Sequence, residues 1–69
     1  MEDLLELLEK TAMHLVDDRV KLNTWLDANK DKPTRVRVSV GVVTDLLQTT
    51  QRITQETARL VRDLLQSSA

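Results

Sequence analysis

Apolar residues in the first part of the chain recur at spacings of three and four positions. This repeat is the heptad seam of an amphipathic helix, and it runs from about residue 3 to about residue 29. Leu4, Thr11 and Trp25 flank the seam, and Arg19 is its single interruption. The seam residues are Leu5, Leu8, Ala12, Leu15, Leu22 and Leu26. The opposite face carries charged side chains, so the pattern predicts one amphipathic helix over residues 3–29.

The period is lost over residues 28–33, which marks a connection. Asn29 suits a left-handed C-terminal cap, and Pro33 cannot extend a preceding helix. Thr34 then lies where an N-cap belongs. The sequence therefore predicts a turn at about residues 30–34.

The three–four spacing resumes after the turn and continues in phase. Its seam consists of Val36, Ser39, Val43, Leu46, Thr50, Ile53, Thr57, Leu60 and Leu64. A second stripe beside it consists of Val40, Leu47, Thr54 and Val61. This pattern predicts a second helix over about residues 35–67, roughly 48 Å long at 1.5 Å per residue.

Residues 34–40 also alternate cleanly, which is typical of a strand. Val36, Val38 and Val40 would lie on one side, with Arg35, Arg37 and Ser39 on the other. A strand followed by two helices resembles a ribbon-helix-helix domain, with an added N-terminal helix here. That resemblance implies a small dimeric DNA-binding transcriptional regulator that reads bases with a β-ribbon. Its nucleic-acid contacts would come from Lys30, Lys32, Arg35, Arg37 and Ser39.

Two long helices joined by a short turn must lie antiparallel. This pairing brings the acidic residues Glu2, Asp3 and Glu6 beside Arg59 and Arg62, so that opposite charges meet. We therefore expect an all-α, antiparallel two-helix hairpin as a single domain over residues 1–69. The ribbon-helix-helix arrangement is the alternative, and the net charge of −1 gives it no support from overall attraction to phosphate.

The size of the chain favours association with a second copy. A 69-residue protein has a thin stability margin, and the absence of cysteine excludes disulfides as its remedy. We expect a homodimer that forms a four-helix bundle, in which the end of the second helix outruns the first helix. The expected oligomer or partner interface comprises Leu4, Leu5, Leu8, Ala12, Leu15, Leu22, Trp25, Leu26, Val43, Leu46, Leu47, Thr50, Ile53, Thr57, Leu60, Leu64 and Leu65.

Three threonines, Thr50, Thr54 and Thr57, interrupt the apolar stripes of the second helix. Their hydroxyls can bond back to their own helix while their methyl groups pack. Alternatively, they form a polar layer that fixes register or leaves a weak point for another protein's helix. Both interpretations stay open at the level of the sequence.

Few residues offer catalytic or ligand chemistry. His14 is the only histidine, and Asp17 and Asp18 are adjacent on a helix and so point in different directions. We therefore expect no catalytic residue, no metal site and no cofactor. Trp25 is large enough to pack within the hairpin or to anchor a partner. We expect Arg19 to lay its stem along the edge of the bundle and to pair with an acid such as Asp45.

These observations predict a non-enzymatic protein–protein interaction module, a dimerisation or adapter domain whose partner is a second copy or another protein. The acidic start and the lack of an apolar run of about 18 residues predict a soluble, cytoplasmic protein without a membrane span.

Overall fold

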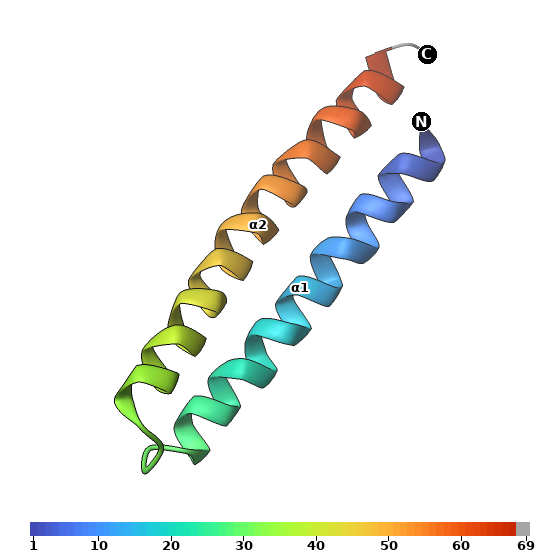
Figure 1. Ribbon diagram of the computed structural model, residues 1–69. Coiled ribbons are helices and arrows are strands. Elements are labelled where there is room, and N and C mark those ends of the chain that lie inside the picture. The colour runs from blue at the N-terminus through green and yellow to red at the C-terminus, as the bar shows by residue number, and fades with distance from the viewer. Residues whose placement is uncertain (68–69) are drawn as a thin grey trace.

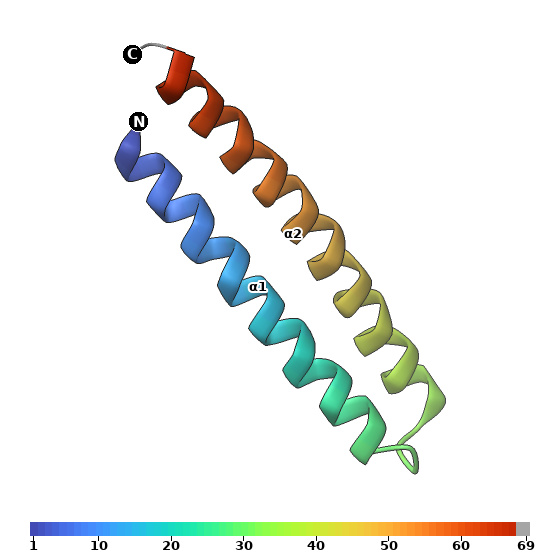
Figure 2. The same ribbon diagram turned by 180° about the vertical axis from the view of Figure 1, so that it is seen from behind.

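The computed structural model describes residues 1–67 and contains two helices over that range. Helix α1 spans Glu2–Ala28 and helix α2 spans Thr34–Ser67. The two lie side by side and antiparallel, joined by a short turn (Figures 1 and 2). The all-α antiparallel hairpin predicted from the sequence is confirmed.

The turn is built differently from the prediction. Asn29 has a φ of −123° and so is not a left-handed cap; its N–H donates to the Leu26 carbonyl and its side-chain amide to the Trp25 carbonyl. Helix α2 starts at Thr34, and the Pro33 carbonyl accepts from the N–H groups of Val36 and Arg37. Thr34 is thus the first helical residue rather than the N-cap, because the Pro33 carbonyl already accepts the first helical hydrogen bond, as that of an N-cap residue does.

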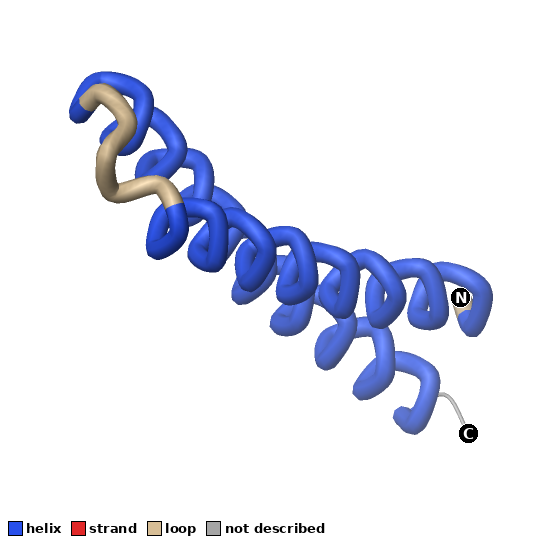
Figure 3. Tube along the Cα trace, turned by 90° about the horizontal axis from the view of Figure 1, so that it is seen from below, coloured by secondary structure: helices blue, strands red, loops and turns tan. Residues whose placement is uncertain are grey.

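The strand alternative for residues 34–40 is wrong. This segment is the first part of α2, and residues 1–67 contain no strand (Figure 3). The Ser39 hydroxyl donates to the Arg35 carbonyl one turn earlier, and Arg37 reaches across to the Leu26 carbonyl. The uninterrupted seam of α2 therefore prevails over the local preference of valines for strands.

We call the stripe of α2 that packs against α1 the inner stripe, and it mixes small and polar residues with valines and leucines. Its buried members are Thr44, Thr54, Ala58 and Val61, and its half-buried members are Arg37, Val40, Gly41, Leu47, Gln51 and Leu65. On α1 the predicted seam faces α2, with Ala12 buried and the remaining seam residues half-buried. Small side chains at the contact allow two helix axes to approach closely.

The hairpin encloses a thin core. Only five of the described residues are buried, and none of those residues has an essentially inaccessible side chain. The Cα trace measures 56 × 14 × 12 Å, with a radius of gyration of 16.0 Å. A compact chain of this length has a radius of gyration of about 11 Å. Two helices alone therefore leave much of their apolar surface in solvent.

Candidate interaction face

The most apolar seam of α2 does not face α1. Val43, Leu46, Ile53, Leu60 and Leu64 are each between 46% and 64% exposed. Each seam residue directly precedes a residue of the stripe that packs on α1, as Val43 precedes Thr44. One residue turns a helix by about 100°, so the seam lies a quarter-turn or slightly more away from α1. We call this exposed stripe of α2, from Val36 to Leu64, the outer seam.

Helix α1 has a corresponding outer stripe, each member of which directly precedes a residue that packs against α2. Its members are Leu4, Leu7, Thr11, His14, Asp18, Lys21 and Trp25. Trp25 is half-buried and Leu7 is 62% exposed. The stripe is therefore apolar at its two ends and polar in its middle.

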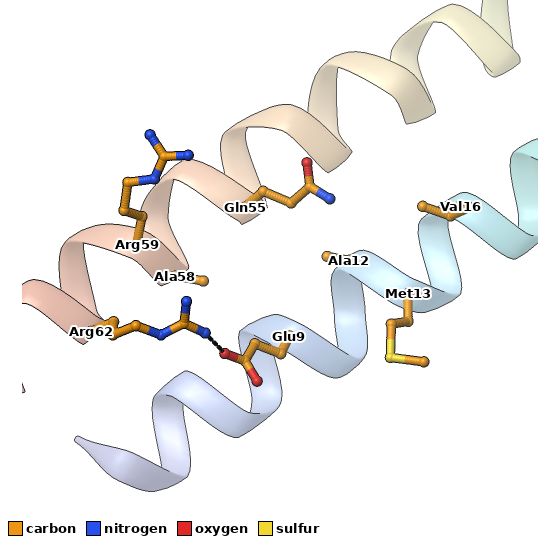
Figure 4. A pocket seen from close by; sticks show the side chains of 8 residues that line it. All are labelled: Glu9, Ala12, Met13, Val16, Gln55, Ala58, Arg59 and Arg62. Atoms are coloured by element: carbon orange, nitrogen blue, oxygen red, sulfur yellow. Dashed lines mark hydrogen bonds and ion pairs between the residues drawn. The ribbon is translucent and has the colours of Figure 1, made fainter.

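The outer seam and the α1 outer stripe lie on the same side of the hairpin. Helices α1 and α2 are right-handed and run in opposite directions. In both helices, the residue one position before a residue of the helix contact therefore points to the same side of the hairpin. The residues that directly follow the helix-contact residues in the sequence confirm this geometry, because those of α1 and those of α2 meet on the opposite side of the hairpin. There Glu9 and Met13 from α1 share a groove with Arg59 and Arg62 from α2 (Figure 4).

The groove on that opposite side carries the one ion pair between the two helices among the described residues. The Arg62 guanidinium contacts the Glu9 carboxylate (Figure 4). The sequence predicted that Arg62 would meet Glu2, Asp3 or Glu6, but Glu6 pairs with Lys10 of its own helix at 3.0 Å. The prediction that an acid of α1 meets Arg62 was correct in sign, but the predicted acids lie one to two helical turns closer to the N-terminus than Glu9 does.

The end of α2 overhangs α1 less than the sequence suggested. Leu65 is half-buried and lines a shallow depression with Met1, Glu2 and Asp3, so it lies beside the start of α1. Leu60 and Leu64 are exposed because they face away from α1, since they belong to the outer seam. An overhang is therefore the wrong explanation for their exposure.

The threonines on the two stripes of α2 donate to their own helix. The hydroxyls of Thr50, Thr54 and Thr57 each bond to the carbonyl four residues earlier, at 2.7–2.8 Å. Thr54 is buried against α1, whereas Thr50 and Thr57 are exposed on the outer seam. Because every hydroxyl is satisfied locally, these residues place methyl groups on both stripes without an orphaned polar atom.

The contact between the helices is polar near its centre. Ala12 and Ala58 line the same groove between the two helices. Arg19 lies seven residues after Ala12, and Gln51 lies seven residues before Ala58, so the antiparallel pairing places Arg19 opposite Gln51. Both residues are half-buried. The Gln51 Oε1 atom is buried without a hydrogen-bond partner. Arg19 forms no ion pair with Asp45 within residues 1–67, because Arg19 lies on the helix contact and Asp45 is exposed.

The structure distributes the expected interface residues over two different surfaces. Leu5, Leu8, Ala12, Leu15, Leu22, Leu26, Leu47 and Leu65 lie along the contact between α1 and α2. The outer seam and the α1 outer stripe together form the open face of the hairpin. The expected interface residues on this open face are Leu4, Trp25, Val43, Leu46, Thr50, Ile53, Thr57, Leu60 and Leu64. Leu7 and Val36, which were not predicted to belong to the interface, are also exposed on this side, and each directly precedes a residue of the helix contact.

The residues considered for other chemistry are exposed on α1. His14 and Asp18 are exposed, and Asp17 contacts Lys21 at 3.8 Å. Within residues 1–67 no group of three histidine or acidic residues could hold a metal ion. Over the same range, neither helix combines the length and apolar character that crossing a membrane requires.

The basic residues near the turn do not form one surface. Lys32 and Arg35 are exposed, whereas Arg37 is half-buried and directed toward the end of α1.

Comparison of the chain with protein-family models, with curated proteins and with solved structures gives no match.

Proposed function

We propose that this chain is a non-enzymatic self-association module, in which two hairpins pack open face to open face as a four-helix bundle. Its role is to hold two copies together, and with them whatever each copy is joined to. The observation that carries this proposal is the outer seam, an apolar heptad stripe that a second copy would cover.

The exposed area supports an interface of ordinary size. The chain exposes 5409 Å², whereas a compact protein of 7.9 kDa exposes about 4,400 Å². The excess of about 1,000 Å² is close to the roughly 800 Å² that each partner contributes to a standard protein interface. Covering the open face once would thus give the chain the burial expected for its mass.

The angle between the two stripes of α2 supports a bundle rather than a flat pair. A helix in a four-helix bundle contacts two neighbours about a quarter-turn apart around its axis. The inner stripe and the outer seam are separated by about 100°. Helix α2 is therefore already shaped to pack against α1 on one side and against a second hairpin on the next.

Two exposed valines on different sides of α2 provide a matched test. Val43 belongs to the outer seam and is 46% exposed, while Val38 lies on the opposite side of α2, two heptads before Arg52, and is 60% exposed. In the dimer, V43E would place two carboxylates in an apolar contact and remove two buried valines. We expect its dissociation constant, measured by analytical ultracentrifugation, to rise by at least about 100-fold.

The control variant V38E makes the same chemical change on the opposite side of α2, and we expect it to dimerise like the parent. A parent protein that stays monomeric at millimolar concentration would contradict the proposal. Equal effects of V38E and V43E on the dissociation constant would place the interface somewhere other than the outer seam.

A further inference from the structure

Resting on the proposed self-association, we propose that the two copies pack with their turns at opposite ends of the bundle. In this arrangement α2 of one copy lies antiparallel along α2 of the other. The second copy is thus recognised by its outer seam and by the charges that border it.

A two-fold axis can bring two open faces together in two ways. If the axis runs along the hairpin, the turns meet and each α2 lies against the α1 of the other copy. If the axis crosses the hairpin, the turns lie at opposite ends and each helix meets its own counterpart. The two arrangements therefore differ in what covers the outer seam.

With the turns together, the outer seam would be covered by the polar middle of the α1 outer stripe. His14, Asp18 and Lys21 would then lie against residues such as Leu46 and Ile53. Burying a charged group against apolar side chains without a partner costs several kcal/mol. Nothing on the outer seam offers such a partner, since its polar members are neutral hydroxyls.

With the turns apart, the outer seam is its own complement. Val36 and Leu64 lie at equal distances from Thr50, fourteen residues to either side. An antiparallel crossing at Thr50 therefore covers the whole seam in both copies. A shallow apolar depression lined by Val36, Ser39 and Val43 at the turn end would receive Leu60 or Leu64 of the second copy.

The charges bordering the outer seam agree with this crossing. Arg35 lies fourteen residues before Thr49, and Asp63 lies fourteen residues after it, on the edge of the seam that faces away from α1. Both are exposed, and neither takes part in an ion pair within residues 1–67. An antiparallel crossing centred between Thr49 and Thr50 covers the seam and brings Arg35 to within about one residue, or about 1.5 Å along the axis, of the level of Asp63 of the second copy, and it does so twice by symmetry.

The ends of the hairpins carry the same complementarity. In the arrangement with turns apart, Lys30 and Lys32 at one copy's turn lie over the first turns of the other copy's α1. Those turns carry Glu2, Asp3 and Glu6, all exposed. With the turns together, the lysines of the two turns would lie close to one another, which is unfavourable.

The orientation can be measured directly because the chain has no cysteine. A K32C variant carries one spin label at the exposed turn, and pulsed electron paramagnetic resonance gives the distance between the labels of two copies. We expect a distance comparable with the 56 Å long axis of the hairpin. A much shorter distance would show that the turns meet and would overturn the orientation while leaving self-association intact. The absence of any distance between copies, with a monomer in ultracentrifugation, would overturn both proposals.

A charge exchange tests the contact itself. We expect R35E and D63R each to weaken the dimer by about 3- to 30-fold, because each removes two symmetric surface pairs. The double variant R35E/D63R restores both pairs with reversed signs, so its dissociation constant should return toward that of the parent. R52E, the same change on the opposite side of α2, is the control and should leave the dimer unchanged. A double variant weaker than either single variant would contradict the pairing.

Discussion

Gln51 shows how a single side chain weakens the contact between the two helices. It occupies an inner position of α2, where a leucine would complete the stripe, and its Oε1 atom is buried without a partner. A buried acceptor left unpaired costs about 1–3 kcal/mol. Arg19 lies opposite and is half-buried, yet no hydrogen bond joins it to Gln51 among the described residues.

We therefore predict that Q51L stabilises the folded protein by about 1–2 kcal/mol, because it removes the unpaired acceptor and adds apolar contact. Urea unfolding followed by circular dichroism at a fixed protein concentration measures the change. The control is Q48L, which makes the same substitution at an exposed position and should change the free energy of unfolding by less than about 0.5 kcal/mol. A destabilised Q51L would show that Gln51 has a partner in the assembled protein.

At the scale of elements, the sequence was sufficient to predict two helices but not which stripe of α2 faces α1. Both stripes repeat with the same period, so periodicity alone cannot rank them. The structure places the stripe with Thr44, Thr54 and Ala58 inside, because small residues allow the axes to approach. Bulkier Leu46 and Leu60 remain outside, where they can meet a more distant neighbour.

The caps and the individual ion pairs were harder to predict than the helices. Asn29 and Thr34 carry the right chemistry for caps, but Pro33 takes the position before α2. The partner of Arg62 depends on the axial offset between the helices, which charge pattern does not fix. Such details follow from packing, whereas helix type follows from a repeat many residues long.

Gly41 gives a prediction that belongs to α2 as an element. It lies inside the helix, and a Cβ atom built there would meet nothing within 4 Å. Glycine in a helix interior costs about 0.5–1 kcal/mol relative to alanine. We expect G41A to raise the free energy of unfolding by that amount, measured by chemical denaturation. A loss of stability would show instead that a second chain packs closely over Gly41.

At the scale of the whole molecule, folding and association should be one process. The isolated hairpin buries few residues, so covering the open face contributes a large share of its stability. Such coupling makes stability depend on protein concentration by mass action.

We predict that the melting temperature rises by about 3–6 °C for each tenfold increase in protein concentration. Thermal unfolding followed by circular dichroism over a hundredfold range would measure this dependence. V43E should abolish most of this dependence, whereas V38E should retain it. A melting temperature that is independent of concentration in the parent would indicate a hairpin that is stable alone.

The placement of the chain ends has a consequence for attachment. The N-terminus and the end of α2 lie together, with the turn at the far end of a molecule 56 Å long (Figure 1). A domain fused at either terminus would leave from one pole, while a dye or linker at the turn would occupy the other. Since only two continuous helices separate the poles, the hairpin can serve as a rigid spacer whose length is set by residue count, at about 1.5 Å per residue of paired helix.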